Sequence, residues 1–384
     1  MTFKEILKMH AEKYPEILPQ DLIKLAYQGA FGAEHLIGDY EEAKEDFKAE
    51  WERMQWIYDE ELPDAEDSLY EWVSPNFARI NMDACKEVGL PAEWIFTLFM
   101  SSAEKGPVDS ANAVFMKYLE EIRRVCREHC FSFDEEKWSN EVRSYLSDGV
   151  YPVRHSERYR KAELPAYRII DREAVALLRI LQAVNDFPDD DDVHVIAIDG
   201  RSAAGKSSLS LTLQKYIDAA VIHTDDFYLP ERLRTEERYA VPGGNIHFER
   251  FFREIIPGLK EKESFSYRPF DCETMAPGEE RIIQAAPCRI VEGAYSHHPI
   301  FGDYADLKIF LNIDEALQTE RLKARNGEAA EDYKKRWIPL EEAYIDYYGI
   351  EYDADIILQA EDVVQLEEAK DLDDSDASGE SAES

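Results

Sequence analysis

Cationic residues and cysteines are both scarce in this sequence. The 384 residues include 44 lysines and arginines against 81 aspartates and glutamates, which gives a formal net charge of −37. Nucleic acids and anionic membranes are bound by clustered lysine and arginine, so this balance argues against either as a partner. The five cysteines are few and odd in number, which is typical of reduced thiols and not of a disulfide framework.

Two of these cysteines, Cys126 and Cys130, stand four residues apart with His129 between them. A zinc site needs further Cys or His ligands at a suitable spacing, and the neighbouring sequence offers none. The spacing matches one face of a helix. We therefore predict structural thiols on that face.

Long apolar runs are also missing. The start of the chain, Met1-Thr-Phe-Lys-Glu-Ile-Leu-Lys8, lacks the apolar core of a signal peptide. No stretch approaches the roughly 20 apolar residues of a membrane-spanning helix. We expect a cytoplasmic protein that does not cross a membrane. A length of 384 residues with 45% hydrophobic content predicts two domains with sizeable cores.

The clearest positive signal is the pattern G-x-x-x-x-G-K-S at residues 200–207. A short apolar strand precedes it at 193–198 and a helical pattern follows it, the arrangement of a phosphate-binding P-loop. Lys206 is expected to reach the β- and γ-phosphates of ATP, and the Ser207 hydroxyl to bind Mg²⁺. The predicted nucleotide-binding residues are Gly200, Arg201, Ser202, Ala203, Ala204, Gly205, Lys206, Ser207 and Ser208.

Carboxylates follow two further apolar segments. Asp225 and Asp226 come after a strand predicted around 221–222, and Glu292 ends a strand predicted at 290–291. In a parallel sheet such residues lie at the ligand-binding edge. Asp225 is predicted to accept the proton of an attacking hydroxyl or to join the Mg²⁺ shell through water, and Glu292 to position Mg²⁺.

Two more segments carry candidate side chains. Residues 265–272 form an aromatic stretch that contains Arg268 and Asp271, which suits either a small polar acceptor or a plain hairpin. Arg321 and Arg325 lie four residues apart on one face of a predicted helix. They are predicted to neutralise charge on the transferring phosphoryl group or to form surface ion pairs.

These pieces together resemble the uridine kinase and phosphoribulokinase family of P-loop kinases over residues 193 to about 360. The matching segments are 200–208, Asp225-Asp-Phe-Tyr228, Tyr267-Arg-Pro-Phe-Asp271, Val291-Glu-Gly293, 321–325 and 354–358. The resemblance implies that Asp225 is the base, that Ser207 and Glu292 serve Mg²⁺, that Tyr228 lines the acceptor pocket, and that Arg321 and Arg325 belong to a lid.

The chain departs from that family at one position. Uridine kinases carry an aspartate that holds the ribose hydroxyls within an Asn-x-Asp segment, and here the comparable stretch is Asn245-Ile-His247. An imidazole does not grip a diol as a carboxylate does. The candidate acceptor-binding residues are Tyr228, Asp226, His247, Arg268 and Asp271. A nucleoside leads as acceptor by resemblance, with a sugar or a vitamin as the alternative.

The predicted fold class is an α/β P-loop NTPase fold, a parallel sheet flanked by helices, preceded by a mostly α-helical domain. The predicted ranges are a helical domain of unknown role at 1–185, an acidic linker at 186–192, a kinase domain at 193–360 and an acidic disordered tail at 361–384.

The N-terminal half carries weaker signals. Glu34 and His35 lie in an apolar stretch that is either a helix junction or a pocket loop. Five basic residues gather at 154–168, either as a solvated face or as the first place to seek a phosphate or carboxylate partner. They are Arg154, Arg158, Arg160, Lys161 and Arg168.

Three functional hypotheses follow. The first is an ATP- and Mg²⁺-dependent kinase that phosphorylates a hydroxyl of a small molecule, with a homo-oligomer left open. The second is a nucleotide-driven switch that regulates the N-terminal domain and has no acceptor. The third makes the N-terminal half a separate enzyme with Glu34, His35 and His155 in its site.

Overall fold

The computed structural model describes residues 1–33, 40–54, 69–106, 109–188, 190–271, 274–327 and 330–363. The chain divides into two compact units, Met1–Asp186 and Phe187–Ser384. Each unit has its own hydrophobic core. Glu34 and His35 lie outside the described residues, as does most of the predicted tail.

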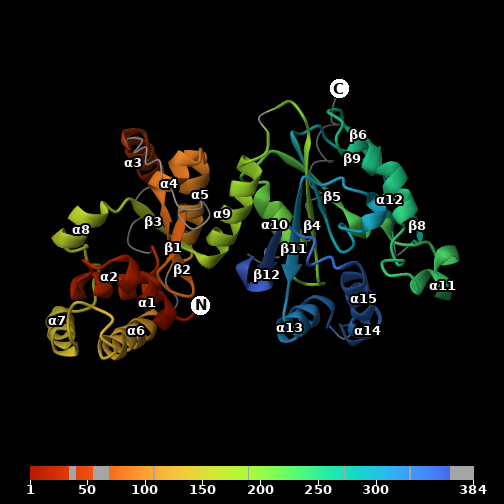
Figure 1. Ribbon diagram of the computed structural model, residues 1–384. Helices are drawn as coiled ribbons and strands as arrows, with labels where there is room; N and C mark the ends of the chain where they lie inside the picture. Colours follow the sequence, from red (N-terminus) through yellow and green to blue (C-terminus); the bar gives the residue numbers. More distant parts are fainter. Residues whose placement is uncertain are drawn as a thin grey trace, which may run out of the picture. The chain divides into compact units, whose positions relative to one another are not determined.

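The first unit is mainly helical (Figure 1). Its helices are α1 (Phe3–Lys13), α2 (Pro19–Phe31), α3 (Tyr40–Arg53), α4 (Met82–Glu87), α5 (Ala92–Glu104), α6 (Ala111–Cys126), α7 (Glu135–Ser147), α8 (Glu157–Glu163) and α9 (Arg172–Asn185). They accompany an antiparallel sheet of order β1-β2-β3, formed by β1 (Tyr70–Trp72), β2 (Phe77–Asn81) and β3 (Tyr167–Asp171). The predicted helical character is confirmed.

Helix α2 forms the centre of this unit because it buries nearly every side chain it carries. It packs against α6 and α7, whose buried residues include Phe115 and Trp138. Helix α6 ends at Cys126, so Cys130 lies beyond the helix and the predicted shared helix face is wrong. Both thiols are free, and the described residues hold no cluster of three potential metal ligands.

The second unit is built on a five-stranded sheet of order β12-β11-β4-β10-β5. Every neighbouring pair in it is parallel. The strands are β4 (His194–Gly200), β5 (Ala219–His223), β10 (Cys288–Glu292), β11 (Leu307–Asn312) and β12 (Ile356–Gln359). Strand β4 is central and almost wholly buried, as expected for a continuous apolar run. The predicted α/β P-loop fold class is confirmed.

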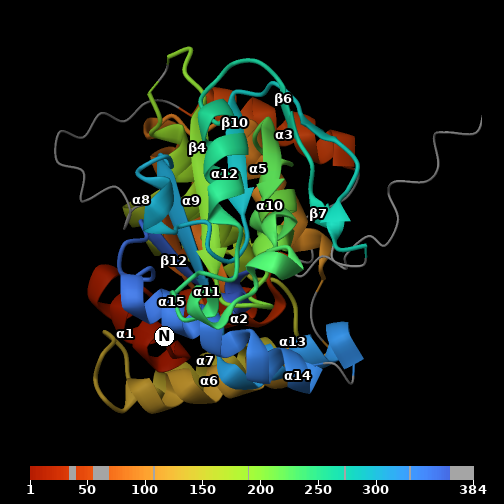
Figure 2. The same cartoon turned by 90° about the vertical axis from the view of Figure 1, so that its right-hand side faces the viewer.

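Helices and short hairpins surround this sheet. The helices are α10 (Lys206–Leu213), α11 (Glu236–Tyr239), α12 (Phe248–Glu254), α13 (Glu315–Asn326), α14 (Ala330–Arg336) and α15 (Ile338–Tyr348), with a 3₁₀ turn, η2, at Thr224–Phe227. Two hairpins pair β6 (Phe265–Tyr267) with β9 (Arg281–Ile283) and β7 (Phe270–Asp271) with β8 (Ala276–Pro277). Helix α10 packs against β4 and β10, and α13, α14 and α15 gather below the sheet (Figures 1 and 2). No helix among the described residues is both long and apolar enough to cross a membrane.

Candidate active site

The loop between β4 and α10 has the geometry of a phosphate cradle. Gly200 has a φ of +140°, and a Cβ built there would lie 2.2 Å from the Leu311 carbonyl oxygen. Gly205 has a φ of +106° and precedes the first turn of α10. Both positions therefore require glycine. Lys206 opens α10, and its Nζ donates to the carbonyls of Gly200 at 2.9 Å and Arg201 at 3.1 Å. The chain thus wraps around the lysine at a helix N-terminus, where anions are favoured.

Helix α13 holds this loop in place. The Arg321 guanidinium donates to the carbonyls of Ala203 at 3.1 Å and Ala360 at 3.1 Å. The side chain of Gln318, one turn earlier, donates to the Ser202 carbonyl at 3.0 Å. These contacts fix the path of the loop backbone. A direct role of Arg321 in phosphoryl transfer stays a prediction.

A buried carboxylate from α15 also contacts the loop. Glu341 Oε2 accepts the backbone N–H of Ser202 at 3.0 Å, and the Ser202 hydroxyl bonds to Glu341 and, at 2.9 Å, to Tyr333. Burial and the charge of Asp225 raise the pKa of Glu341, while Lys206 and Ser202 oppose that rise. The sequence missed this residue because Glu341 and Glu342 are adjacent acids on one helix, and no pattern separates them.

The predicted Mg²⁺ ligands meet at the end of β10. The Ser207 hydroxyl donates to Glu292 Oε1 at 3.2 Å, and Glu292 is only 4% exposed. His223, at the end of β5, hydrogen-bonds to the same oxygen through Nδ1. Burial lowers the pKa of His223, but the bond and charge of Glu292 outweigh burial and raise it. A hydroxyl and a carboxylate oxygen side by side suit a hard cation such as Mg²⁺.

Turn η2 places Asp225 next to this pair. Thr224 donates to the Ala294 carbonyl at 2.9 Å and fastens the turn to the segment after β10. Asp225 keeps access to solvent although protein atoms surround it. This partial desolvation and the charge of Glu292 raise the pKa of Asp225, while Lys206, His223 and Arg325 act in the opposite direction.

The interactions that perturb these pKa values show which predicted residues come together. Asp225 lies within electrostatic reach of Lys206, Glu292 and Arg325, although the four belong to different elements. The Arg325 guanidinium lies over the Tyr333 ring at 5.8 Å. Lys206, Glu292 and Arg325 are therefore close enough to Asp225 to influence its pKa.

The candidate acceptor residues have local partners. Asp226 accepts from Arg281 at 2.6 Å and from the Tyr267 hydroxyl. Asp271 accepts the Thr274 hydroxyl at 2.8 Å. Arg268 is exposed and follows β6. Strand β7, which carries Asp271, contacts η2, so this segment still borders the candidate site.

Tyr228 forms an isolated antiparallel bridge with Ile246, the residue before His247. His247 is the N-cap of α12, where its Nδ1 accepts the backbone N–H of Arg250 at 3.4 Å. The same nitrogen lies 3.2 Å from Glu249. The imidazole of His247 is thus engaged with its own helix.

Two buried polar residues near the loop lie beside each other. Asn245 and Tyr295 are both 5% exposed, and a hydrogen bond with the Asn245 side chain opposes the rise in the pKa of Tyr295. Burial and the nearby charge of Glu341 raise the pKa of Tyr295, so the tyrosine lies close to the cradle. The sequence signalled neither residue.

The sheet, the glycine loop and helix α10 define a protein of the P-loop class. The chain is similar to a protein described as a possible uridine kinase from Bacillus stearothermophilus, at 19% identity and a TM-score of 0.37, over 49% of this chain and 97% of that one. It is similar to a fructose transport system kinase from Silicibacter sp. TM1040, at 26% identity and a TM-score of 0.37, over 47% and 98%.

A third similar structure is a D-glycerate 3-kinase from Cryptococcus neoformans, at 14% identity and a TM-score of 0.34, over 50% of this chain and 96% of that one. All three neighbours are described as kinases. No protein-family model and no curated protein matches the chain.

Proposed function

We propose that the second unit is an ATP- and Mg²⁺-dependent kinase that transfers the γ-phosphoryl group to a hydroxyl of a small molecule. One observation carries this proposal. Lys206 and Glu292 both influence the pKa of Asp225, and the three residues follow or end the neighbouring strands β4, β10 and β5. A phosphoryl transferase needs a phosphate cradle, a cation site and a base in that arrangement.

The chain's own groups divide the work. The backbone N–H groups of the loop and Lys206 bind the phosphates. The Ser207 hydroxyl and Glu292 hold Mg²⁺, which supplies charge neutralisation to the phosphate oxygens. Helix α13 keeps the loop amides oriented through Arg321.

Asp225 is the proposed base. Its carboxylate takes the proton of the acceptor hydroxyl as that oxygen bonds to the γ-phosphorus and the bond from phosphorus to the β–γ bridging oxygen breaks. The raised pKa of Asp225 supports this role, because a more basic carboxylate accepts the proton more readily. Arg325, whose charge lowers the pKa of Asp225, compensates the negative charge of the transferring group.

The acceptor is a nucleoside or another small metabolite with a hydroxyl group. His247 caps α12 and lies against Glu249, which supports a sugar or a vitamin over a ribose-gripped nucleoside.

An acceptor screen distinguishes the proposed kinase from a nucleotide-driven switch that has no acceptor. ATP consumption is measured with nucleosides, sugars and vitamins for the wild type, Asp225→Asn and Asp218→Asn. Asp218 is an exposed carboxylate at the opposite end of β5 and serves as the matched control. We expect acceptor-dependent turnover that Asp225→Asn lowers by about 10² to 10⁴ and Asp218→Asn leaves intact. Turnover that needs no acceptor and survives Asp225→Asn contradicts the kinase and favours the switch.

A further inference from the structure

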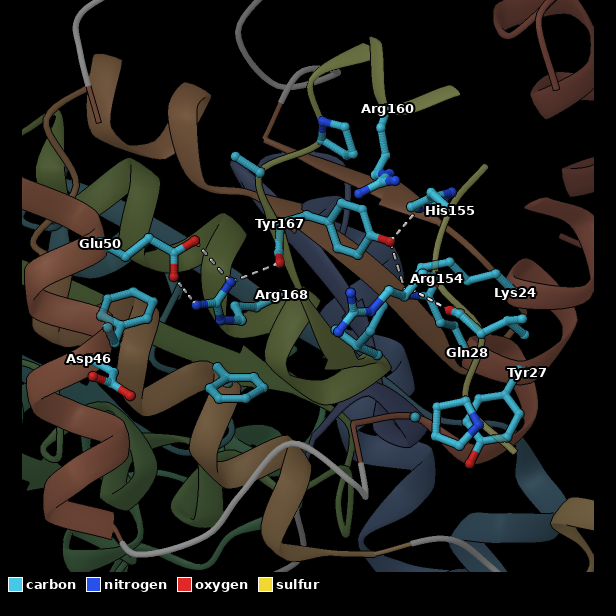
Figure 3. A pocket seen from close by; sticks show the side chains of 18 of the residues that line it. Lys24, Tyr27, Gln28, Asp46, Glu50, Arg154, His155, Arg160, Tyr167 and Arg168 are labelled. Atoms are coloured by element: carbon cyan, nitrogen blue, oxygen red, sulfur yellow. Dashed lines mark hydrogen bonds and ion pairs between the residues drawn. The ribbon is translucent and has the colours of Figure 1, made fainter. Parts of the chain in front are cut away.

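The first unit contains a cavity of about 670 Å³ that the kinase proposal does not use (Figure 3). Residues of α2, α3 and β3 and of the segment 152–160 line it. In Figure 3, Glu50 and Arg168 lie on one side of Tyr167, and Lys24, Arg154 and His155 lie on the other. A volume of this size suits a metabolite.

Three cations of this cavity have no carboxylate partner. Among the described residues, Lys24, Arg154 and Arg160 form no ion pair, and Lys24 Nζ donates only to the Val153 carbonyl at 3.0 Å. Arg160 reaches toward Tyr167 (Figure 3). Unpaired cations in one cavity are notable in a chain with a net charge of −37, where carboxylates are abundant.

The other charged residues that line the cavity are one arginine and two acids. Arg168 pairs with Glu50 and is neutralised by it. Asp46, an exposed acid on α3, is the other carboxylate among the described lining residues. Four cationic and two anionic side chains thus line the cavity, which leaves a net charge of +2.

A rigid hydrogen-bonded chain orients the Tyr167 hydroxyl in the cavity. His155 Nε2 bonds to this hydroxyl at 2.6 Å, and His155 Nδ1 bonds to Asp21 at 3.1 Å. Asp21 also accepts the backbone N–H and the hydroxyl of Ser156. An acceptor-only carboxylate makes Nδ1 the donor, so Nε2 accepts the proton of the tyrosine hydroxyl. Gln28 donates to the same oxygen at 3.1 Å.

A buried arginine that pairs with Glu71 lies behind this chain. The Arg79 guanidinium lies 4.7 Å from the centre of the Tyr167 ring and donates to the Gln28 side-chain oxygen Oε1 at 2.8 Å. Burial and Arg79 lower the pKa of Lys24 to about 8, although Asp21 opposes that change. Lys24 therefore remains mostly protonated at pH 7, and a bound anion would favour its charged form.

We propose that this cavity binds a phosphorylated small molecule through Lys24, Arg154 and Arg160. A monocarboxylate is satisfied by one bidentate arginine, whereas a phosphate dianion has the charge and the oxygens to occupy three cationic donors. The volume beyond the phosphate accommodates the body of a metabolite against the aromatic rings of Tyr27, Phe47 and Phe99.

The experiment uses the full chain with Lys206→Ala, which reduces phosphate binding at the P-loop. Inorganic phosphate and glucose 6-phosphate are titrated and followed by the ³¹P NMR line width. The test variant adds Arg154→Gln and Arg160→Gln. The control adds Arg143→Gln and Lys161→Gln, two exposed cations of the same unit outside the cavity. The melting temperature of each variant checks that the unit is folded.

We expect both probes to bind, glucose 6-phosphate more tightly, and the test variant to bind about tenfold more weakly or worse. The control variant should bind within about twofold of its parent because its cations lie outside the cavity. Equal binding by the test and control variants, or no binding of either probe, overturns the proposal. Displacement of phosphate by an equal concentration of succinate also overturns it, because the site would then be a carboxylate site. These outcomes are independent of kinase activity.

Discussion

At the residue scale, the site combines Lys206 with three carboxylates, those of Asp225, Glu292 and Glu341. At Asp225 the positive charges of Lys206, His223 and Arg325 do not outweigh burial and the charge of Glu292. The pKa values of Asp225 and Glu341 are accordingly raised, by desolvation first and by the neighbouring carboxylates next. A cation bound at Glu292 would relieve part of this repulsion. The pKa of the proposed base, Asp225, is thus already raised in the protein without a ligand.

The first prediction concerns the pH dependence of phosphoryl transfer. A base must be deprotonated, so the rate falls as the pH falls through the pKa of Asp225. Because that pKa is raised, the acid limb of kcat/KM should lie above the range of an ordinary aspartate. Glu292 contributes to the rise, so Glu292→Gln should move the limb of the residual activity to lower pH. A limb that stays in place in this variant would remove Glu292 as the cause.

The second prediction concerns Gly293, which has a φ of +127° and whose added Cβ would lie 2.1 Å from the Thr224 hydroxyl. Gly293→Ala should lower the free energy of unfolding by about 1 to 3 kcal/mol through strain and displace the turn that carries Asp225. Gly302 has a φ of +72° and open space around its Cβ position. Gly302→Ala should therefore cost about 1 kcal/mol and leave transfer unchanged. Thermal melts and kcat report the two effects, and equal losses in both variants refute the packing argument.

At the scale of secondary-structure elements, some strands could be predicted from the sequence and others could not. Strands β4 and β10 were predictable because each is an apolar run that ends at a glycine or an acid. Strand β3 was not, because its Tyr-Arg-Ile-Ile-Asp pattern is short and follows a basic stretch. Asp225 and Glu292 were predicted as site residues because the ends of parallel strands meet at one edge.

The residues that sequence reasoning missed depend on tertiary contacts. Glu341 reaches the loop only because α15 packs beside it, and Asn245 and Tyr295 are identified only by their burial. The N-cap role of His247 was also hidden, since histidine is not among the favoured N-cap residues. Helix periodicity identified α13 but did not tell which of its arginines supports the loop.

The third prediction divides the two arginines of α13. Arg321 donates to loop carbonyls, whereas Arg325 is near enough to Asp225 to lower its pKa. Arg321→Gln should weaken nucleotide binding by about tenfold, since charged hydrogen bonds contribute about 1.5 to 3 kcal/mol, with a smaller change in kcat. Arg325→Gln should instead lower kcat by about tenfold or more and change nucleotide affinity less. Nucleotide binding and single-turnover rates measure the split. If Arg321→Gln lowers kcat more than Arg325→Gln does, Arg321 and not Arg325 stabilises the transferring phosphoryl group.

Each unit of the whole molecule has its own stabilising network, and in the first unit the network centres on Glu71. Burial by itself raises the pKa of Glu71, but His10, Arg79 and Lys13 and the Tyr14 hydroxyl lower it to about 2. A lowered carboxyl pKa adds stability above the unfolded value, and this contribution is lost as the pH falls through the folded value.

The fourth prediction follows from that sign. Glu71→Gln should destabilise the first unit near neutral pH by up to about 3 kcal/mol. The gap from wild type should close as the pH falls from about 4.5 towards about 2, the window set by the shift of Glu71. Glu12→Gln removes an exposed acid of α1 and should show no such gap. Melting temperatures across this window measure the difference, and a gap that does not change with pH would assign the loss to packing.

The fifth prediction concerns the division of the chain after Asp186. Asn185 donates to the Val88 carbonyl at 3.1 Å within the first unit, while Phe187 stacks on His194 at 4.6 Å within the second. Because each flanking residue packs into its own unit, the fragments 1–186 and 187–384 should both fold alone. The second fragment should bind nucleotide with the affinity of the full chain. Full acceptor-dependent turnover by this fragment would make the first unit dispensable for transfer. Nucleotide binding without turnover would instead show that the first unit contributes to the acceptor step.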